Sequence, residues 1–110
     1  MKISNKIGIL VFAYNRPSHL RRVLIALEDY KINKINLILD GPKNKKDYIC
    51  QKEIKSIVFG KTTIDINFIQ RTKNFGLAKS ITLALDSFSK IYENLIIIED
   101  DCIPRKEFFR

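Results

Sequence analysis

The chain alternates between short apolar runs and longer segments whose apolar residues recur every three or four positions. The apolar runs predict four strands, in residues 7–14, 35–40, 63–70 and 94–98. The longer segments predict three helices, in residues 17–30, in residues 46–59 and after Gly76. Strictly alternating strands and helices predict right-handed crossovers and a mainly parallel sheet. We therefore expect a three-layer α/β/α domain with helices on both faces of the sheet.

Two of the predicted strands carry opposite signals about their place in the sheet. Residues 63–70 alternate apolar with polar side chains, which predicts a strand with one less buried face, near an edge. Residues 94–98, "NLIII", are almost uninterruptedly apolar. This pattern predicts a central strand that is covered on both faces.

Length and composition predict one folded domain that spans residues 1–110. Hydrophobic residues make up 45% of the chain and charged residues 29%, which is typical of a globular protein. No apolar run reaches the roughly 20 residues that span a bilayer, and the first apolar run has no cleavage pattern of a signal peptide. Cys50 and Cys102 lack metal-ligand spacing and fit free thiols in a reducing compartment. We expect a cytoplasmic protein.

The formal net charge of +8 raises the question of an anionic partner. Lysines gather around one loop and the segment after it, at Lys43, Lys45, Lys46, Lys52 and Lys55. No aromatic signature of RNA binding accompanies them, so we interpret the cluster as a solvated loop and expect no nucleic-acid partner. The basic balance is compatible with peripheral association at the inner face of a membrane, although no amphipathic anchor stands out.

Polar residues follow each predicted strand. These strand ends are Ala13-Tyr14-Asn15-Arg16, Asp40-Gly41, Gln70-Arg71 and Glu99-Asp100-Asp101. In a parallel sheet the carboxyl ends of the strands share one rim, and ligands bind outside that rim. The sequence therefore predicts that these polar residues lie together along one rim of the sheet.

The three consecutive acids Glu99, Asp100 and Asp101 suit a divalent cation, because carboxylate oxygens are hard ligands for Mg²⁺ or Mn²⁺. Successive side chains of an extended chain diverge, so one or two of the acids would bind the metal. A charged turn or a helix cap is the structural alternative. Asp40 is equally open, because Asp-Gly is an ordinary turn as well as a candidate ligand site.

Four further residues are ambiguous. Asn74 and Gly76 suit a loop and a helix start, and Lys79 either faces a phosphate from the first helical turn or is simply exposed. Arg71 is either solvated or placed for a diphosphate. His19 lacks an acidic partner in sequence, so we do not assign it a catalytic role.

Four segments, taken in order, read "IGILVFAYNRPSHLRRVLIAL", "LILDGP", "RTKNFGLAKSITLAL" and "LIIIEDDCIP". Together they resemble the nucleotide-sugar-binding half of a GT-A glycosyltransferase, which has a Rossmann-like nucleotide-diphospho-sugar transferase fold. They are similar to the family-two enzymes. The pairing of "LDG" with "EDD" also resembles the N-acetylglucosaminyltransferase I type. The resemblance implies transfer of a sugar from a nucleotide-diphosphate sugar, favouring a UDP-sugar, to a saccharide or lipid-linked acceptor in bacterial surface polysaccharide synthesis.

The resemblance also implies residue roles. Ala13, Tyr14, Asn15 and Arg16 would lie against the nucleotide, Asp40 would accept a hydrogen bond from the base, and Arg71 with the loop through Asn74 and Gly76 would close over it. Asp101 would ligate Mn²⁺ or Mg²⁺ directly, with Asp100 on the metal, ribose or sugar and Glu99 on the donor sugar. The catalytic base and the acceptor site are expected after Arg110, so the chain resembles a truncated domain.

Three alternatives remain open. A nucleotidyltransferase usually has a Gly-rich loop after the first strand, and "AYNRPSHL" contains no glycine. A receiver-type signalling module carries its acid pair after the first strand, where this chain has Tyr14, Asn15 and Arg16. A binding module without activity would keep the nucleotide site alone.

Overall fold

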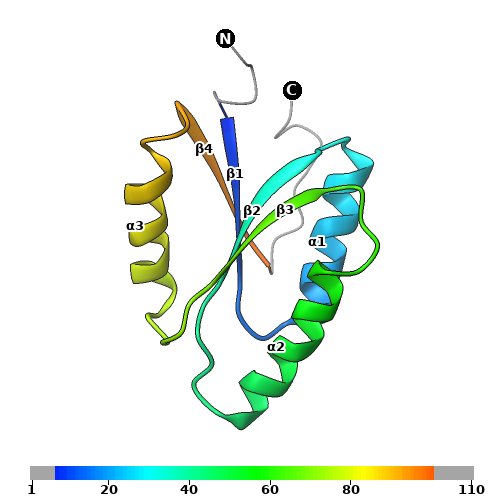
Figure 1. Ribbon diagram of the computed structural model, residues 1–110, viewed down its shortest axis with the longest axis vertical. Helices are drawn as coiled ribbons and strands as arrows, with labels where there is room; N and C mark the ends of the chain where they lie inside the picture. Colours follow the sequence, from blue (N-terminus) through cyan, green and yellow to red (C-terminus); the bar gives the residue numbers. More distant parts are fainter. Residues whose placement is uncertain (1–6, 101–110) are drawn as a thin grey trace.

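The computed structural model describes residues 7–100, and all seven predicted elements are present in the predicted order (Figure 1). The elements are β1 (Ile7–Ala13), α1 (Pro17–Asp29), β2 (Lys34–Leu39), α2 (Lys45–Val58), β3 (Asp65–Gln70), α3 (Leu77–Phe88) and β4 (Asn94–Glu99). The predicted boundaries agree to within one or two residues. None of the helices in this range is long and apolar enough to cross a membrane.

The four strands form one all-parallel sheet in the order β3-β2-β1-β4. The chain moves outward from β1 to β2 and β3, and then returns past β1 to β4. Because parallel crossovers are right-handed, this reversal sends the third helix to the opposite face of the sheet. Helices α1 and α2 therefore cover one face and α3 covers the other, as Figure 1 shows. The α/β class and the two helical layers are confirmed.

Alternate residues of β1 and β2 supply the two halves of the core. Val11 and Leu37 are fully buried on the side of α1 and α2. Leu10 and Ile38 face α3, where they pack with Ala84 and Phe88. Helix α1 contributes an inward face made of Leu20, Val23, Leu24 and Leu27. β1 and β2 thus hold the centre of the domain, and their carboxyl ends are fixed by packing on both faces.

The prediction of a central position for "NLIII" is wrong, because β4 pairs with β1 alone and lies at an edge of the described sheet. Leu95 packs with the α3 side and Ile98 with the α1 side, so the apolar run does report contact with both layers. It does not report a second neighbouring strand, and Ile97 is 38% exposed. The edge position predicted for residues 63–70 is confirmed, since β3 is the other outer strand.

Candidate functional site

A cavity of about 260 Å³ opens at the carboxyl ends of β1, β2 and β4, beside the start of α3. It lies where the order of strand addition reverses between β1 and β4, the position at which ligands of open parallel sheets bind. These strand ends lie toward the lower end of the sheet in Figure 1. Three of the four predicted strand ends therefore border one concave surface, and the end of β3 does not contribute to it.

Most of the predicted site residues line this cavity. They are Ala13, Tyr14, Asn15, Arg16, Asp40, Asn74, Gly76, Glu99 and Asp100. The cavity also takes in Leu77 and Ser80, which were not candidate site residues, and Lys43, which was assigned from the sequence to a solvated loop. Leu77 is 49% exposed at the first position of α3, where no helical turn precedes it. The predicted metal ligand Asp101, like Cys102, lies outside the described residues.

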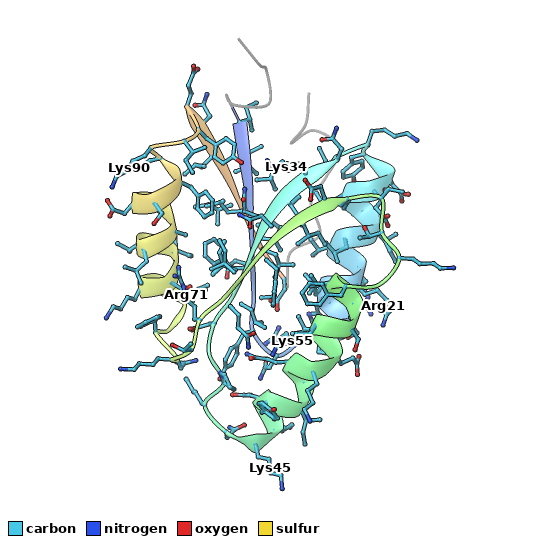
Figure 2. The ribbon with its side chains drawn as sticks, in the orientation of Figure 1. Arg21, Lys34, Lys45, Lys55, Arg71 and Lys90 are labelled. Carbon is cyan, nitrogen blue, oxygen red and sulfur yellow. The ribbon has the colours of Figure 1, made fainter. Side chains whose placement is uncertain are left out.

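Two predicted site residues do not line the cavity. The backbone N–H of Arg71 donates to the carbonyl of Leu39 at 2.9 Å, continuing the β2–β3 pairing, and its Nε is buried without a hydrogen-bond partner in residues 7–100. The exposed Lys79 ammonium lies 5.1 Å from the centre of the Phe75 ring, a cation–π contact on the outer side of the loop. Figure 2 shows Arg71 on the approach to α3.

Asp40 fastens the end of β2 to the loop before α3. Its Oδ1 accepts hydrogen bonds from the N–H groups of Gly41 and Phe75, both at 2.9 Å, and its Oδ2 accepts one from Gly76 at 3.0 Å. The Asn74 amide returns a hydrogen bond to the carbonyl of Gly41 at 2.7 Å. We call this arrangement of residues 40–41 and 74–76 the Asp40 clasp. The carboxylate thus sets the shape of the cavity wall, a role beyond the turn and ligand functions considered from sequence.

A second carboxylate, Asp47 at the start of α2, holds the loop after β1. It accepts hydrogen bonds from the Tyr14 hydroxyl, from the Asn15 amide at 2.9 Å and from the N–H of Lys43 at 3.2 Å. Its own N–H is capped by the Asn44 side chain at 2.8 Å. Tyr14 and Asn15 are therefore positioned in the cavity by a residue of a different element.

These contacts change the acidity of both partners. The hydrogen bond from Tyr14, followed by that from Asn15, lowers the pKa of Asp47 below its ordinary value of 3.8. Burial, together with the hydrogen bond to Asp47, raises the pKa of Tyr14 from 10.0 to about 12. Both groups therefore keep their neutral-pH forms, an ionised carboxylate and a protonated phenol, over a widened pH range.

Gln51 joins the ends of the two central strands. Its Nε2 donates to the carbonyl of Tyr14 at 2.9 Å and to that of Asp40 at 2.7 Å. Asp47 and Gln51 were not identified from the sequence as supporting residues of the site. They lie at positions i and i+4 of the inward face of α2, which Ile54 and Val58 continue. Polar residues at positions where the helical spacing predicts buried side chains, near the N-terminus of the helix, could have indicated this supporting role.

Glu99 and Asp100 form the wall of the cavity at β4. The N–H of Asp100 donates to the carbonyl of Phe12 at 3.1 Å, and Asp100 Oδ2 accepts the N–H of Tyr14 at 3.4 Å. Residues 7–100 contain no group of three or more metal-ligating side chains. Two adjacent carboxylates still fit Mg²⁺ or Mn²⁺, which commonly take one or two protein carboxylates together with phosphate oxygens and water.

The pH dependence of stability should report the Tyr14–Asp47 contact. The folded chain retains the phenolic proton more tightly than the unfolded chain, so this contribution is complete below pH 10.0 and is lost as the pH rises toward about 12. We expect the urea midpoint of the native protein to fall more steeply across this range than that of Tyr14→Phe. Circular dichroism measures the urea midpoint at each pH, and absorbance reports the ionisation of the phenols. If the urea midpoints of the native protein and of Tyr14→Phe fall equally steeply with pH, this assignment is wrong.

The opposite wall of the cavity is the start of α3. Gly76, with φ of 81°, turns the chain into the helix, and Ser80 in its first turn is 1% exposed. The Ser80 hydroxyl is buried without a hydrogen-bond partner in the described chain. The cavity thus lies between the carboxylates of Glu99 and Asp100 on one side and the start of α3 on the other.

Comparison of the chain with models of known protein families, with curated proteins and with solved structures found no significant match.

Proposed function

We propose that the chain is the donor-binding half of a metal-dependent glycosyltransferase of the GT-A type, and that its cavity takes a nucleoside diphosphate sugar. One observation carries this proposal: the cavity lies at the reversal of strand order, with Glu99 and Asp100 on one wall and the start of α3 on the other. Helical N–H groups and a metal bound by carboxylates are complementary ways of holding a diphosphate.

The parts of the donor can be assigned to the walls of the cavity. The nucleoside would lie against Tyr14 and Asn15, whose positions Asp47 fixes. The N–H groups at the start of α3 and the cationic side chains of Arg16 and Lys43 would face the phosphates. Asp40 would contact the base. It would also keep the loop before α3 in place, because its carboxylate accepts hydrogen bonds from three backbone N–H groups.

Asp100, together with Asp101 outside the described residues, would hold Mn²⁺ or Mg²⁺, and Glu99 would contact the donor sugar. When bound, the ion would offset the charge of the diphosphate and of the nucleoside diphosphate that leaves. The volume of about 260 Å³ is below the roughly 300–1,000 Å³ of typical ligand sites. The nucleotide would therefore fill the cavity and the sugar would project beyond it.

The proposal includes a saccharide or lipid-linked acceptor, a role in bacterial surface polysaccharide synthesis and a cytoplasmic location. These follow from the sequence resemblance. In this proposal residues 7–100 supply donor binding, whereas the acceptor and the general base require further residues. Binding of the donor without any release of nucleoside diphosphate by the complete protein would favour the alternative of an inactive binding module.

Isothermal titration with UDP tests the proposal directly. We expect binding in the presence of Mn²⁺ and a loss of about tenfold or more in affinity after chelation or in Asp100→Asn, because metal affinity falls by that order when a ligating group is disturbed. Asp65→Asn, an exposed acid at the start of β3, is the matched control and should bind as the native chain does. Unchanged binding after chelation would overturn the metal-dependent site.

A further inference from the structure

Helix α2 presents an outward face that combines lysines with large apolar side chains. Lys45, Tyr48, Ile49, Lys52 and Phe59 recur at helical spacing opposite the buried positions of the helix. Tyr48 is 51% exposed, Ile49 58% and Phe59 71%. Phe59 makes an edge contact with the Phe68 ring, and the Lys52 ammonium lies 5.0 Å from the centre of the Tyr48 ring. We call these five residues the α2 outer face.

Charge is concentrated on the same helix. Helix α2 itself holds four lysines and two acids, a net charge of +2, and Lys43 and Lys61 flank it. One of the two acids, Asp47, is buried and hydrogen-bonded to Tyr14, so it adds little to the outer surface. Helices α1 and α3 have equal numbers of basic and acidic residues, with His19 neutral. Figure 2 shows Lys45 projecting from the outer end of α2.

We infer that the α2 outer face docks on an anionic lipid bilayer. Lysine stems lie beside apolar side chains while their ammonium groups reach lipid phosphates, and Tyr48, Ile49 and Phe59 enter the boundary between headgroups and acyl chains. A nucleic acid fits this surface less well, because Ile49 offers no stacking plane and the cluster contains no arginine. This surface is hard to recognise from the sequence, because α2 has apolar residues both on its outer face and on the face that packs against the sheet.

Docking in this orientation has a geometric consequence for the cavity. Lys43, in the loop before α2, lines the cavity and belongs to the same basic segment. Lys43 thus links the lining of the cavity to the segment that leads into α2. This arrangement goes beyond donor binding and does not require it, so each proposal can fail independently of the other.

Co-sedimentation with vesicles tests the docking surface. The chain should bind vesicles made of equal parts phosphatidylcholine and phosphatidylserine. It should not bind vesicles of phosphatidylcholine alone, and high salt should abolish its binding to the mixed vesicles. Lys45→Gln with Lys52→Gln should weaken binding by about fivefold for each lysine removed, about 25-fold together. Tyr48→Ser with Ile49→Ser should weaken it by about tenfold or more, because the apolar contribution is lost.

The matched control is Lys90→Gln with Ile91→Ser, beyond α3 on the opposite layer, where Ile91 is 58% exposed. This double variant should bind vesicles as the native chain does. Circular dichroism and urea unfolding should show that all variants remain folded. The inference is overturned if the control loses as much binding as the α2 variants, if only the lysine changes matter, if an oligonucleotide binds in place of vesicles, or if the α2 outer face proves to join two copies in solution.

Discussion

Replacing Asp40 with alanine should lower the free energy of unfolding by about 3 kcal/mol, because hydrogen bonds to a charged acceptor contribute roughly 1.5–3 kcal/mol each and the N–H donors left behind lose their partner. The carboxylate accepts three N–H groups, two of them from the loop before α3, and is only 7% exposed. The loss is a large share of the roughly 5–15 kcal/mol that stabilise a domain. The same change should weaken nucleotide binding by releasing the cavity wall.

Urea unfolding followed by circular dichroism measures this effect. Asp40→Asn is the informative companion, because it keeps one acceptor oxygen but turns an N–H donor toward another N–H donor, and it should lose an intermediate amount. Asp86→Ala, an exposed acid on the outer side of α3, controls for charge. If Asp40→Ala unfolds at the same urea concentration as Asp86→Ala, the Asp40 clasp does not stabilise the domain.

Gly41→Ala should lower the free energy of unfolding by about 2–3 kcal/mol through a steric clash, at the upper end of the cost of overpacking. A Cβ atom at this position would lie 2.4 Å from the carbonyl carbon of Lys73 and 2.8 Å from the N of Asn74. Both are backbone atoms, so no side-chain rotation relieves the contact. The loop before α3 would have to move away from the end of β2, which opens the Asp40 clasp.

Gly60→Ala is the matched control for this substitution. Its added Cβ would approach the carbonyl oxygen of Ser56 to 3.0 Å at the end of α2, a tighter contact than usual but far from the cavity-forming loop. We expect a smaller loss of stability there and normal UDP binding. A Gly41→Ala protein that is as stable as Gly60→Ala would show that the loop can shift at little cost.

The fold followed from the sequence because periodicity reports which faces of each element are covered. Apolar spacing located the helices and strands, and the handedness of parallel crossovers gave the two helical layers. Strand order is a different quantity, since it depends on pairing between distant segments. The apolar run of β4 therefore predicted correctly that both faces contact a helical layer. It predicted a central position, whereas β4 lies at an edge of the described sheet.

The location of the candidate site was also predictable, because parallel strands bring their carboxyl ends together. The supporting contacts were not. Asp47 and Gln51 are polar residues of a helix, and only the packed structure shows that they face Tyr14 and the strand ends. For Lys79 the sequence left two alternatives open, and the structure shows an exposed side chain whose ammonium lies 5.1 Å from the centre of the Phe75 ring.

The single amide of Gln51 has a consequence for how a ligand would be received. By binding the carbonyls of Tyr14 and Asp40 together, it fixes the separation of the two strand ends before any ligand arrives. The conformational entropy of ordering this side of the site is thus lost during folding rather than during binding. A ligand that reaches the cavity therefore meets a floor whose shape is already set, beside a wall that Asp40 holds through the N–H groups of Phe75 and Gly76.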